Sequence, residues 1–570
     1  MRHLRDIFLR ICAWLRRHNA LAALLVFLAA LLLYLPLQLH PSFADPDSFY
    51  HAKSALLLRD RGFIHEFPWL RFTILNDPFV DHHLGYHLVL IPFVTVFPPL
   101  FGMKAAALLF AAGAVATFFF LLRRLQIPAA LLWTTVVATA QPFIFRANIA
   151  RAPALAEILL FLGFLALFEG RTLFLFLTTL IFVWSYNAWP VLFAALFAVI
   201  LGELLVAAGG TGRRAVVSVL TRRIATFGAM SAAAAMGLII NPYFPENLAF
   251  SWLHIVGIGL RNYQDTIGVG AEWYPYAFLD LVKDAPLPFL ALVFSGVLFA
   301  IGVRAGEFRE AEVERRFTHI FTALILAGGF FVLTLKSRRN VEFLIPSMTL
   351  LSATVSAFVF GSDSLRTTQE ALRRTPLLLA GAASFTVLLA VIGGQGITAA
   401  RRDLIGGYPW SRYERAAGYL RVTLPEGATV ITSDWDDFPS LFYWNDRSTY
   451  VIGLDPTYMY LYDRDLYRAW VDLTQGRLAP SRSPSRPVGT GSLAPPAGGG
   501  MGGSGDLVSV IRDRFHASAV LIDNDHEAMR NLFATDHRFE RWYEDDEAAI
   551  YGIGRPPSSF SRSSADASAL

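Results

Sequence analysis

Two aspartates follow the first hydrophobic stretch directly, in the segment 43–51 (Phe-Ala-Asp-Pro-Asp-Ser-Phe-Tyr-His). Carboxylates as close as Asp45 and Asp47 repel each other and are costly to desolvate at a membrane surface, so they persist most readily where a cation lies between them. The pair therefore indicates a divalent-cation site in which a carboxylate can also orient or deprotonate a nucleophile. The alternative is a pair of solvated loop aspartates, with Asp47 as the cap of a following helix.

The composition is that of a membrane protein. Of the 570 residues, 54% are hydrophobic, mean hydropathy is +0.45, and several apolar runs are long enough to cross a hydrocarbon core. The apolar run 21–37 follows a basic leader and has no small-residue cleavage site after it, so we expect a first span and not a signal peptide. The single cysteine, Cys12, excludes intrachain disulfides and a thiolate metal cluster. The modest net charge of +4 argues against a nucleic-acid partner.

The sequence predicts a multi-pass α-helical membrane bundle of about eleven spans, followed by a soluble α/β domain. The segment 86–101 contains three prolines and is expected to be re-entrant or to lie at the surface. The predicted spans are 20–37, 105–122, 127–143, 154–168, 172–188, 190–208, 227–241, 286–303, 318–335, 341–360 and 377–395.

The distribution of arginines orients this bundle. With 86–101 not spanning, the arginine clusters near 123, 171, 213–223, 304–316 and 366–374 all fall on the side of the basic leader, as the positive-inside rule requires. We therefore expect a cytoplasmic (inner) membrane protein with a cytoplasmic N-terminus. The loops 38–104 and 242–285 and everything after the membrane domain (1–397) would then lie on the outer face.

A few basic residues remain on that outer face close to span ends, chiefly Arg146, Arg151, Arg261 and the cluster 336–339. Because basic residues on the outer face run against the positive-inside rule, we expect an anionic partner that binds them. The alternative is ordinary contact with lipid phosphate through extended side chains. The acidic and basic candidates converge on one face of the membrane.

Residues 398–555 are predicted to form an extracytoplasmic α/β domain. Helix-like 411–421 precedes a strand at 428–432, and helix-like 507–515 precedes a strand at 517–522. Acidic clusters follow both strands, at 434–437 and 523–525, where parallel sheets place ligands; the second is expected to be mainly a structural turn. Residues 481–505 are expected to form a flexible insert, and 556–570 a disordered tail.

Four segments resemble motifs of the C-type (GT-C) membrane glycosyltransferases, and most closely those of the oligosaccharyltransferase catalytic subunits. They are residues 45–51, the glutamate-terminated stretch 267–272, the stretch 336–346 with Arg339 seven residues before a proline, and residues 433–438 after the first strand. The resemblance implies two catalytic residues, Asp47 and Glu272, and a Mg²⁺ or Mn²⁺ ion. The expected metal ligands are Asp45, Asp47, Glu157 and Glu272; the expected donor-phosphate ligands are Arg338, Arg339 and Arg151; the expected acceptor contacts are Trp435 and Asp436.

The chain also departs from that family. The stretch 146–157, where a second acidic motif should lie, offers one carboxylate, Glu157. Of the family's Trp-Trp-Asp-Tyr-Gly acceptor motif only Trp435 and Asp436 remain, which leaves a protein, a lipid or a glycan open as the acceptor.

The expected function is transfer of a sugar or oligosaccharide from a polyprenyl phosphate or pyrophosphate to an acceptor on the outer face. The cation and the outer arginines would stabilise the charge that develops on the leaving phosphate. His82, His83 and His87 could line the donor pocket. The alternatives are a monophosphate-sugar transferase that modifies lipid or glycan, a transporter or flippase of lipid-linked glycans, and a non-catalytic membrane scaffold. A transporter should show internal repeats with polar or broken helices at mid-membrane, and the sequence shows no repeat.

Overall fold

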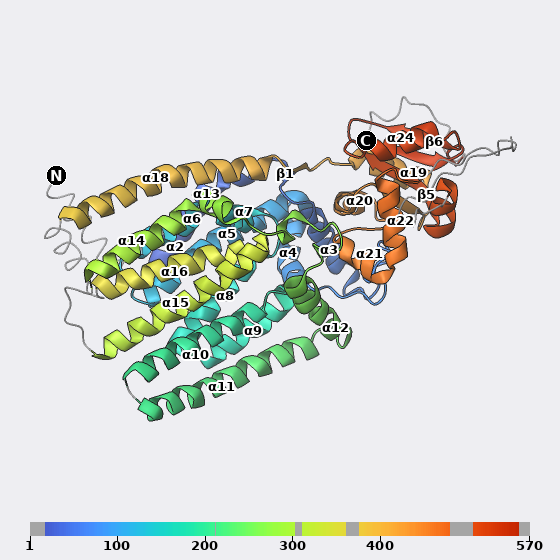
Figure 1. Ribbon diagram of the computed structural model, residues 1–570. Coiled ribbons are helices and arrows are strands. Elements are labelled where there is room, and N and C mark those ends of the chain that lie inside the picture. The colour runs from blue at the N-terminus through green and yellow to red at the C-terminus, as the bar shows by residue number, and fades with distance from the viewer. Residues whose placement is uncertain (1–17, 211, 303–309, 361–375, 479–505, 558–570) are drawn as a thin grey trace, which may run out of the picture.

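The computed structural model describes residues 18–210, 212–302, 310–360, 376–478 and 506–557 (Figure 1). The basic leader, the insert 481–505 and nearly all of the tail 556–570 lie outside these residues. Within them, a long bundle of helices carries at one end a smaller domain built on a β-sheet (Figure 1).

Every expected span overlaps a helix of the bundle, but 127–143 crosses the break between two short helices. Six helices are long and apolar enough to cross a membrane, or up to eight if each of two sharply bent pairs counts as one span, so the count of eleven is not confirmed. The shortfall includes α6 and α9, which have only 10 and 14 residues. The bundle helices are α2 (Asn19–Gln38), α5 (Pro99–Arg124), α6 (Ala130–Thr139), α7 (Gln141–Asn148), α8 (Pro153–Glu169), α9 (Thr172–Ser185), α10 (Pro190–Gly210), α11 (Gly212–Ile239), α14 (Pro286–Gly302), α15 (Glu310–Lys336), α16 (Val341–Phe360) and α18 (Pro376–Ile405).

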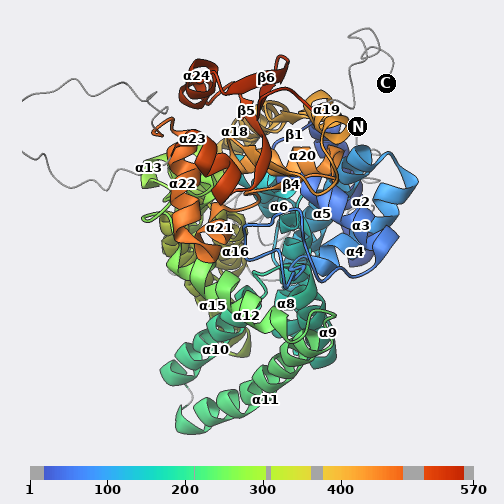
Figure 2. The ribbon, with the colours of Figure 1, turned by 90° about the vertical axis from the view of Figure 1, so that its right-hand side faces the viewer.

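Shorter elements cap the end of the bundle that faces the smaller domain. Helix α3 (Asp47–Arg61) and α4 (Leu84–Val96) come from the first long loop, and α4 is a 13-residue helix with Pro92 inside it, too short to span. Helix α12 (Glu246–Trp252) continues into a π-helix (Leu253–Arg261), and α13 (Phe278–Asp284) meets α14 at a 90° bend. Figure 2 shows that the smaller domain covers only part of this end, because α10 and α11 extend away from it.

A mixed five-stranded sheet organises the C-terminal domain. The strand order is β4-β3-β5-β7-β6, with β3 (Thr429–Thr432) parallel to both β4 (Thr449–Tyr450) and β5 (Ala517–Asp523). The strands β6 (Phe539–Glu544) and β7 (Ala548–Ile553) add an antiparallel hairpin. Since β3 is buried along its whole length and β5 at all but one residue, both faces need cover.

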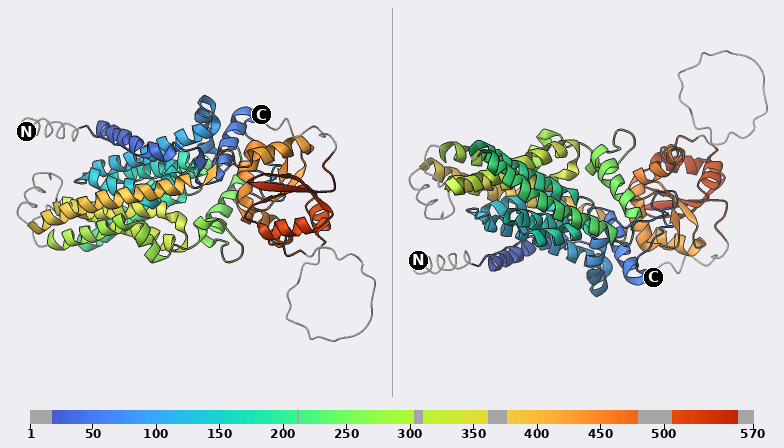
Figure 3. Two further views of the ribbon diagram at one scale, coloured as in Figure 1. Left: turned by 90° about the horizontal axis from the view of Figure 1, so that it is seen from above. Right: turned by 90° about the horizontal axis from the view of Figure 1, so that it is seen from below.

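Helices supply that cover on both sides of the sheet (Figure 3). They are α19 (Glu414–Thr423), α20 (Phe438–Trp444), α21 (Pro456–Tyr462), α22 (Arg464–Thr474), α23 (Leu507–Ser509), which continues as a π-helix (Val510–Arg514), and α24 (Glu527–Thr535). The two strands predicted from the sequence are present as β3 and β5. The membrane helix α18 continues to Ile405, eight residues past the expected boundary at 397.

A two-stranded clamp connects the acidic loop to the C-terminal domain. Strand β1 (Ser42–Phe43) pairs antiparallel with β2 (Tyr408–Pro409), the first segment after α18. The Ser42 hydroxyl donates to the Ile405 carbonyl (3.0 Å), and the Trp410 N–H donates to the Pro41 carbonyl (2.9 Å). Because Asp45 follows β1 by two residues, this clamp sets where the acidic pair lies.

Gly407→Ala should disrupt the clamp. A Cβ on Gly407 would lie 2.1 Å from the Phe43 carbonyl oxygen, so the backbone of β1 must move. We expect a loss of about 1–3 kcal/mol of stability, as for other overpacked sites, measured as a lower thermal midpoint in detergent. Gly418→Ala is the control, since its Cβ meets nothing within 4 Å on helix α19. Equal midpoints for Gly407→Ala and the parent would contradict the role given to the clamp.

Candidate active site

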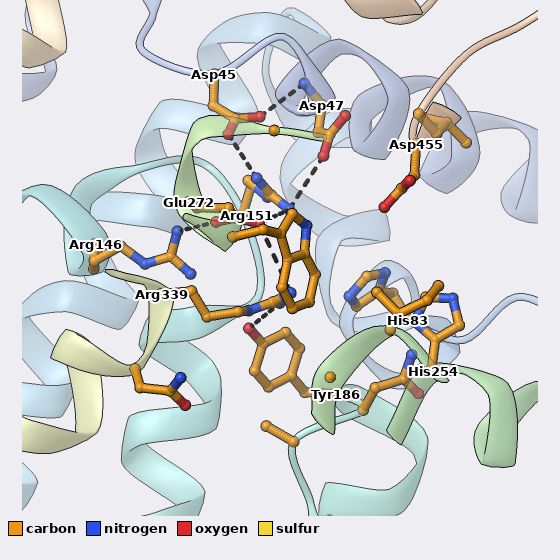
Figure 4. A pocket seen from close by; sticks show the side chains of 18 of the residues that line it. Asp45, Asp47, His83, Arg146, Arg151, Tyr186, His254, Glu272, Arg339 and Asp455 are labelled. Atoms are coloured by element: carbon orange, nitrogen blue, oxygen red, sulfur yellow. Dashed lines mark hydrogen bonds and ion pairs between the residues drawn. The ribbon is translucent and has the colours of Figure 1, made fainter. Parts of the chain in front are cut away.

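One pocket of about 580 Å³ lies between the end of the bundle and the C-terminal domain (Figure 4). Its wall is assembled from the loop before α3, α3 itself, the loop before α4, the α7–α8 connection, the π-helix after α12, the segment 270–273, the start of α16 and the loops after β3 and β4. Of the predicted site residues, Asp45, Asp47, Arg151, Glu272, Arg339, Trp435 and Asp436 all line this pocket. Residues from opposite ends of the sequence therefore meet in one cavity, as the sequence predicted.

The guanidinium of Arg151 lies between the two aspartates. Its Nη1 donates to Asp45 Oδ2 at 2.6 Å, and its Nη2 lies 3.1 Å from Asp47 Oδ2. Asp45 also accepts the Asp47 N–H through Oδ1 (2.9 Å), so Asp45 and not Asp47 caps the first turn of α3. Asp47 Oδ1 is buried and has no donor among the described residues.

The surroundings of Asp47 favour its protonated form. Burial raises the pKa of Asp47 to about 7; the Arg151 cation opposes this shift, whereas Asp45, Glu272 and Asp455 add to it. A carboxyl with its pKa near neutrality and one unpartnered oxygen is suited to accept a proton from a substrate.

Glu272 lies among three arginines. Arg146 Nη1 donates to it at 2.6 Å, and Arg339 and Arg151 lie 3.7 and 3.9 Å away. Although burial works to raise its pKa, the three cations outweigh burial and hold the pKa of Glu272 well below its usual range. Arg146 is itself locked, because its Nε donates to Glu342 Oε2 on α16 at 2.7 Å. Glu272 is thus a permanent anion that holds the arginines in place.

Arg339 has the loosest carboxylate contact of these arginines. Its Nη2 donates to the Tyr186 hydroxyl (2.8 Å), and its guanidinium stacks 4.5 Å from the centre of the Trp273 ring. Arg339 therefore keeps donors available for an anion in the pocket. Its neighbour Arg338 is not among the lining residues; its Nε donates to the Pro275 carbonyl (3.1 Å), and the guanidinium lies over Tyr276.

The acidic cluster after β3 divides between structure and pocket. Asp434 caps the short helix Trp435–Asp437, and Asp437 is fully buried and accepts the Tyr413 hydroxyl (2.7 Å). Trp435 and Asp436 line the pocket, and burial together with Asp434, Asp47 and Asp45 raises the pKa of Asp436. The cluster after β5 is structural, as predicted, since Asp523 accepts the Asp525 and His526 N–H groups.

The carboxylates do not form the divalent-metal cradle that the resemblance implies. Glu157 is 1% exposed inside α8 and is not a lining residue, and Glu272 is already neutralised by arginines. Among the described residues no group of three or more His, Cys, Asp or Glu side chains is arranged to hold a metal ion. The position between Asp45 and Asp47 is taken by the Arg151 guanidinium, which fits a built-in organic cation better than Mg²⁺ or Mn²⁺.

Several lining residues escaped prediction. Tyr186 lies between Ser185 and Asn187 just after α9, and His254 is a single polar residue among apolar ones; neither belongs to a recognisable motif. Asp455 and Tyr458 belong to the stretch 453–458, for which the sequence predicts no more than a turn near the outer cleft; Asp455 caps α21, and both residues line the pocket. The role of Arg146 depends on Glu342, which lies 196 residues further along the chain.

Comparisons with solved structures identify the fold. The chain superposes on the arabinofuranosyltransferase AftD from Mycobacteria with a TM-score of 0.52 at 12% identity, over 95% of this chain and 40% of that one. It superposes on ArnT from Cupriavidus metallidurans, in the apo state, with a TM-score of 0.51 at 13% identity, over 95% of this chain and 98% of that one. The expected fold, that of the GT-C membrane glycosyltransferases, is confirmed. No family model and no curated protein sequence matches the chain.

Removing Arg151 should open a metal site between Asp45 and Asp47. In Arg151→Ala the carboxylates of Asp45 and Asp47 lose the cation between them and face each other across a vacated space. We expect the variant to bind Mn²⁺ at least about tenfold more tightly than the parent, measured as loss of the free-ion signal in electron paramagnetic resonance. The double variant Arg151→Ala/Asp45→Asn should lose the gain. Tight Mn²⁺ binding by the parent that Asp45→Asn abolishes would show instead that the aspartates hold a metal with Arg151 present.

Proposed function

We propose that the chain is a membrane glycosyltransferase that moves a sugar or oligosaccharide from a polyprenyl-linked phosphate to an acceptor bound against the C-terminal domain. The observation that carries the proposal is one pocket lined both by Asp47, whose pKa is raised to about 7, and by Arg339, whose guanidinium keeps donors available. The chain shares its fold with AftD, which is described as an arabinofuranosyltransferase. The shared fold supports glycosyl transfer as the reaction of this chain.

The pocket offers separate places for the parts of such a donor. Its bundle side is apolar, with Phe330, Leu333 and Phe343 from α15 and α16. A polyprenyl chain can lie against these side chains while its phosphate meets Arg339. Arg146 and Arg151 each contact carboxylates at 2.6 Å, whereas the carboxylate contact of Arg339 is 3.7 Å long. One loosely paired arginine suits a monophosphate better than a pyrophosphate.

The reaction follows from these positions. A hydroxyl or amide of the acceptor attacks the anomeric carbon, and the bond from that carbon to the phosphate oxygen breaks. The leaving phosphate keeps the electron pair and is stabilised by Arg339, with Arg151 adding positive potential. Asp47 Oδ1 accepts the proton of the nucleophile. Trp435 and Asp436 hold the acceptor, and Glu272 is a positioning residue for the arginines. No step is assigned to a divalent ion.

The orientation of the bundle agrees with a site on the outer face of a cytoplasmic membrane. Four arginines lie in the first half of α11. That part of α11 joins α10 at the end of the bundle remote from the pocket (Figure 1). By the positive-inside rule the remote end is cytoplasmic, and the pocket with the C-terminal domain lies outside. The protein, lipid or glycan that accepts the sugar is then reached from outside the cell membrane.

Asp47→Asn should abolish transfer. The purified protein is incubated with radiolabelled lipid-linked sugars extracted from membranes, and the product is identified by mass spectrometry. Loss of the general base should lower kcat by about 10²–10⁴-fold while the protein still elutes as a monodisperse species. Asp465→Asn, on an aspartate exposed on α22, is the matched control and should transfer normally. Undiminished transfer by Asp47→Asn would refute the role of Asp47.

The rate of transfer should also depend on pH near neutrality. A general base must be deprotonated to accept a proton, and Asp47 has its pKa raised to about 7, so activity should rise as pH increases through 7 and reach a plateau above it. Residual activity of Asp47→Asn should lack that rise. Single-turnover rates between pH 5 and 9 measure the profile; a flat parent profile over this range would contradict the assignment.

A further inference from the structure

One part of the pocket lining is built from neutral rings. His51, His82, His83 and His254 line it together with Tyr458, and none of them has a role in the transfer described above. Figure 4 shows His83 and His254 across the cavity from Arg146 and Glu272. Burial keeps the pKa of His51, His83 and His254 well below the usual range, so these imidazoles are neutral at physiological pH.

A buried chain of hydrogen bonds fixes one of these rings. His87 Nδ1 donates to Asp81 Oδ2 at 2.7 Å, and the pKa of Asp81 is lowered by His87 and His82 against the effect of burial, so Asp81 is a carboxylate. His51 Nδ1 and His87 Nε2 lie 2.8 Å apart. His87 and His51 are 0% and 2% exposed.

This chain determines the tautomer of His51. A carboxylate only accepts, so His87 donates from Nδ1, and in its neutral form it presents a lone pair at Nε2. His51 must then donate from Nδ1, which leaves Nε2 unprotonated. Among the described residues no protein group is paired with Nε2, and His51 lines the pocket. Edge-to-face contacts with His83 (5.1 Å) and Tyr86 (5.2 Å) hold the ring in place.

His51 also has a defined position relative to the proposed base. It follows Asp47 by four residues on α3, which places the two side chains one turn apart on the same face of the helix. A group that reaches Asp47 with the reacting bond therefore places the rest of its ring near His51. The groups that face His51 from other elements are His87 and Tyr86 on α4, His82 and His83 before it, and Arg151.

We propose that His51 Nε2 accepts a hydrogen bond from a hydroxyl of the transferred sugar, with His87 and Asp81 as positioning residues that fix its tautomer. The ligand of this part of the pocket is a neutral polyhydroxylated ring, since its lining offers uncharged imidazole and phenol groups where the lining around Arg339 offers guanidinium. This inference rests on the proposed transfer reaction and adds the substrate group that His51 selects.

Asp81→Asn tests the inference because it should exchange the donor and acceptor roles in the hydrogen bonds that link residue 81, His87 and His51. Asp81 Oδ1 accepts the His83 N–H (3.0 Å), so the amide oxygen of the variant keeps that bond and its NH₂ group faces His87 Nδ1. His87 must then donate from Nε2 to His51 Nδ1, and His51 presents an N–H to the pocket. In the parent, His51 Nε2 would accept the hydrogen of a sugar hydroxyl; in the variant, that hydrogen would meet the N–H of His51. An Asp-to-Asn change in a catalytic triad produces the wrong histidine tautomer in a comparable way.

The expected result is a rise of about tenfold or more in the KM for the lipid-linked sugar extract, with kcat changed less than about threefold. His51→Phe, which keeps an aromatic ring without the acceptor, should raise KM similarly, and Asp81→Asn should add nothing in that background. Asp265→Asn, on an exposed loop residue, is the matched control and should leave KM unchanged. Unchanged KM in both Asp81→Asn and His51→Phe would overturn the proposal.

A second measurement separates the hydrogen-bond chain from catalysis. In the full-length protein labelled with ¹⁵N-histidine, the His51 resonances, assigned by their loss in His51→Phe, should show a protonated Nδ1 and an unprotonated Nε2, reversed in Asp81→Asn. Protonated Nε2 in the parent would overturn the inference whatever the outcome of the transfer assay. If the parent shows the expected tautomer and yet transfers no sugar, the proposed function fails, and the sugar-binding role of His51 fails with it.

Discussion

The arrangement of the pocket depends on one electrostatic constraint: buried carboxylates and guanidiniums must neutralise one another. Arg151, from the α7–α8 connection, joins Asp45 and Asp47 before and at the start of α3, and Arg146 joins Glu272 to Glu342 on α16. Each pair spans elements far apart in the chain. Removing one member of a buried pair leaves an uncompensated charge, so the loops, the bundle and the acidic segment must keep a single relative position. The β1–β2 clamp extends that constraint to the C-terminal domain.

Charge also divides the pocket into two chemically distinct walls. The lining around Arg339 and Trp273 offers donors and positive potential, whereas the lining around His51, His254 and Tyr458 offers neutral rings and lone pairs; the two meet where Tyr186 stacks on His83. A lipid-linked sugar has the same division, because an anionic phosphate adjoins an uncharged polyol. Each wall would bind the wrong end poorly: a phosphate against neutral imidazoles gains no charge pairing, and a hydroxyl beside Arg339 leaves the guanidinium without an anion. Under the proposed function, the electrostatics of the walls would therefore orient the donor before any specific contact forms.

The sequence predicted what depends on local pattern. Apolar runs located the bundle helices apart from the short α7, and short runs rich in β-branched residues located β3 and β5. The family resemblance and the parity of the spans placed Asp47, Glu272, Arg339 and Trp435 on one face, and all four line the pocket. The sequence did not settle features set by tertiary packing. Arg338 and Arg339 are adjacent and alike in sequence, and only the tight turn at Arg338–Asn340 directs one to Tyr276 and the other into the pocket. Glu157 was the one carboxylate in its segment, but the packing of α8 buries it away from the cavity.

Arg151 also accounts for the departures from the oligosaccharyltransferase pattern. A second acidic motif in the segment 146–157 would supply carboxylates for a shared metal ion, whereas this chain supplies two guanidiniums there. Adding a carboxylate to a site already holding Asp45, Asp47 and Asp436 raises the repulsion that a cation must balance; adding an arginine removes it. A fixed guanidinium balances that charge, but unlike a metal ion it cannot also bind the donor phosphate through open coordination positions. Under the proposed function, phosphate binding would then pass to a separate cation, and Arg339, held by Tyr186 and Trp273 and only loosely paired with Glu272, is the residue we propose for that task.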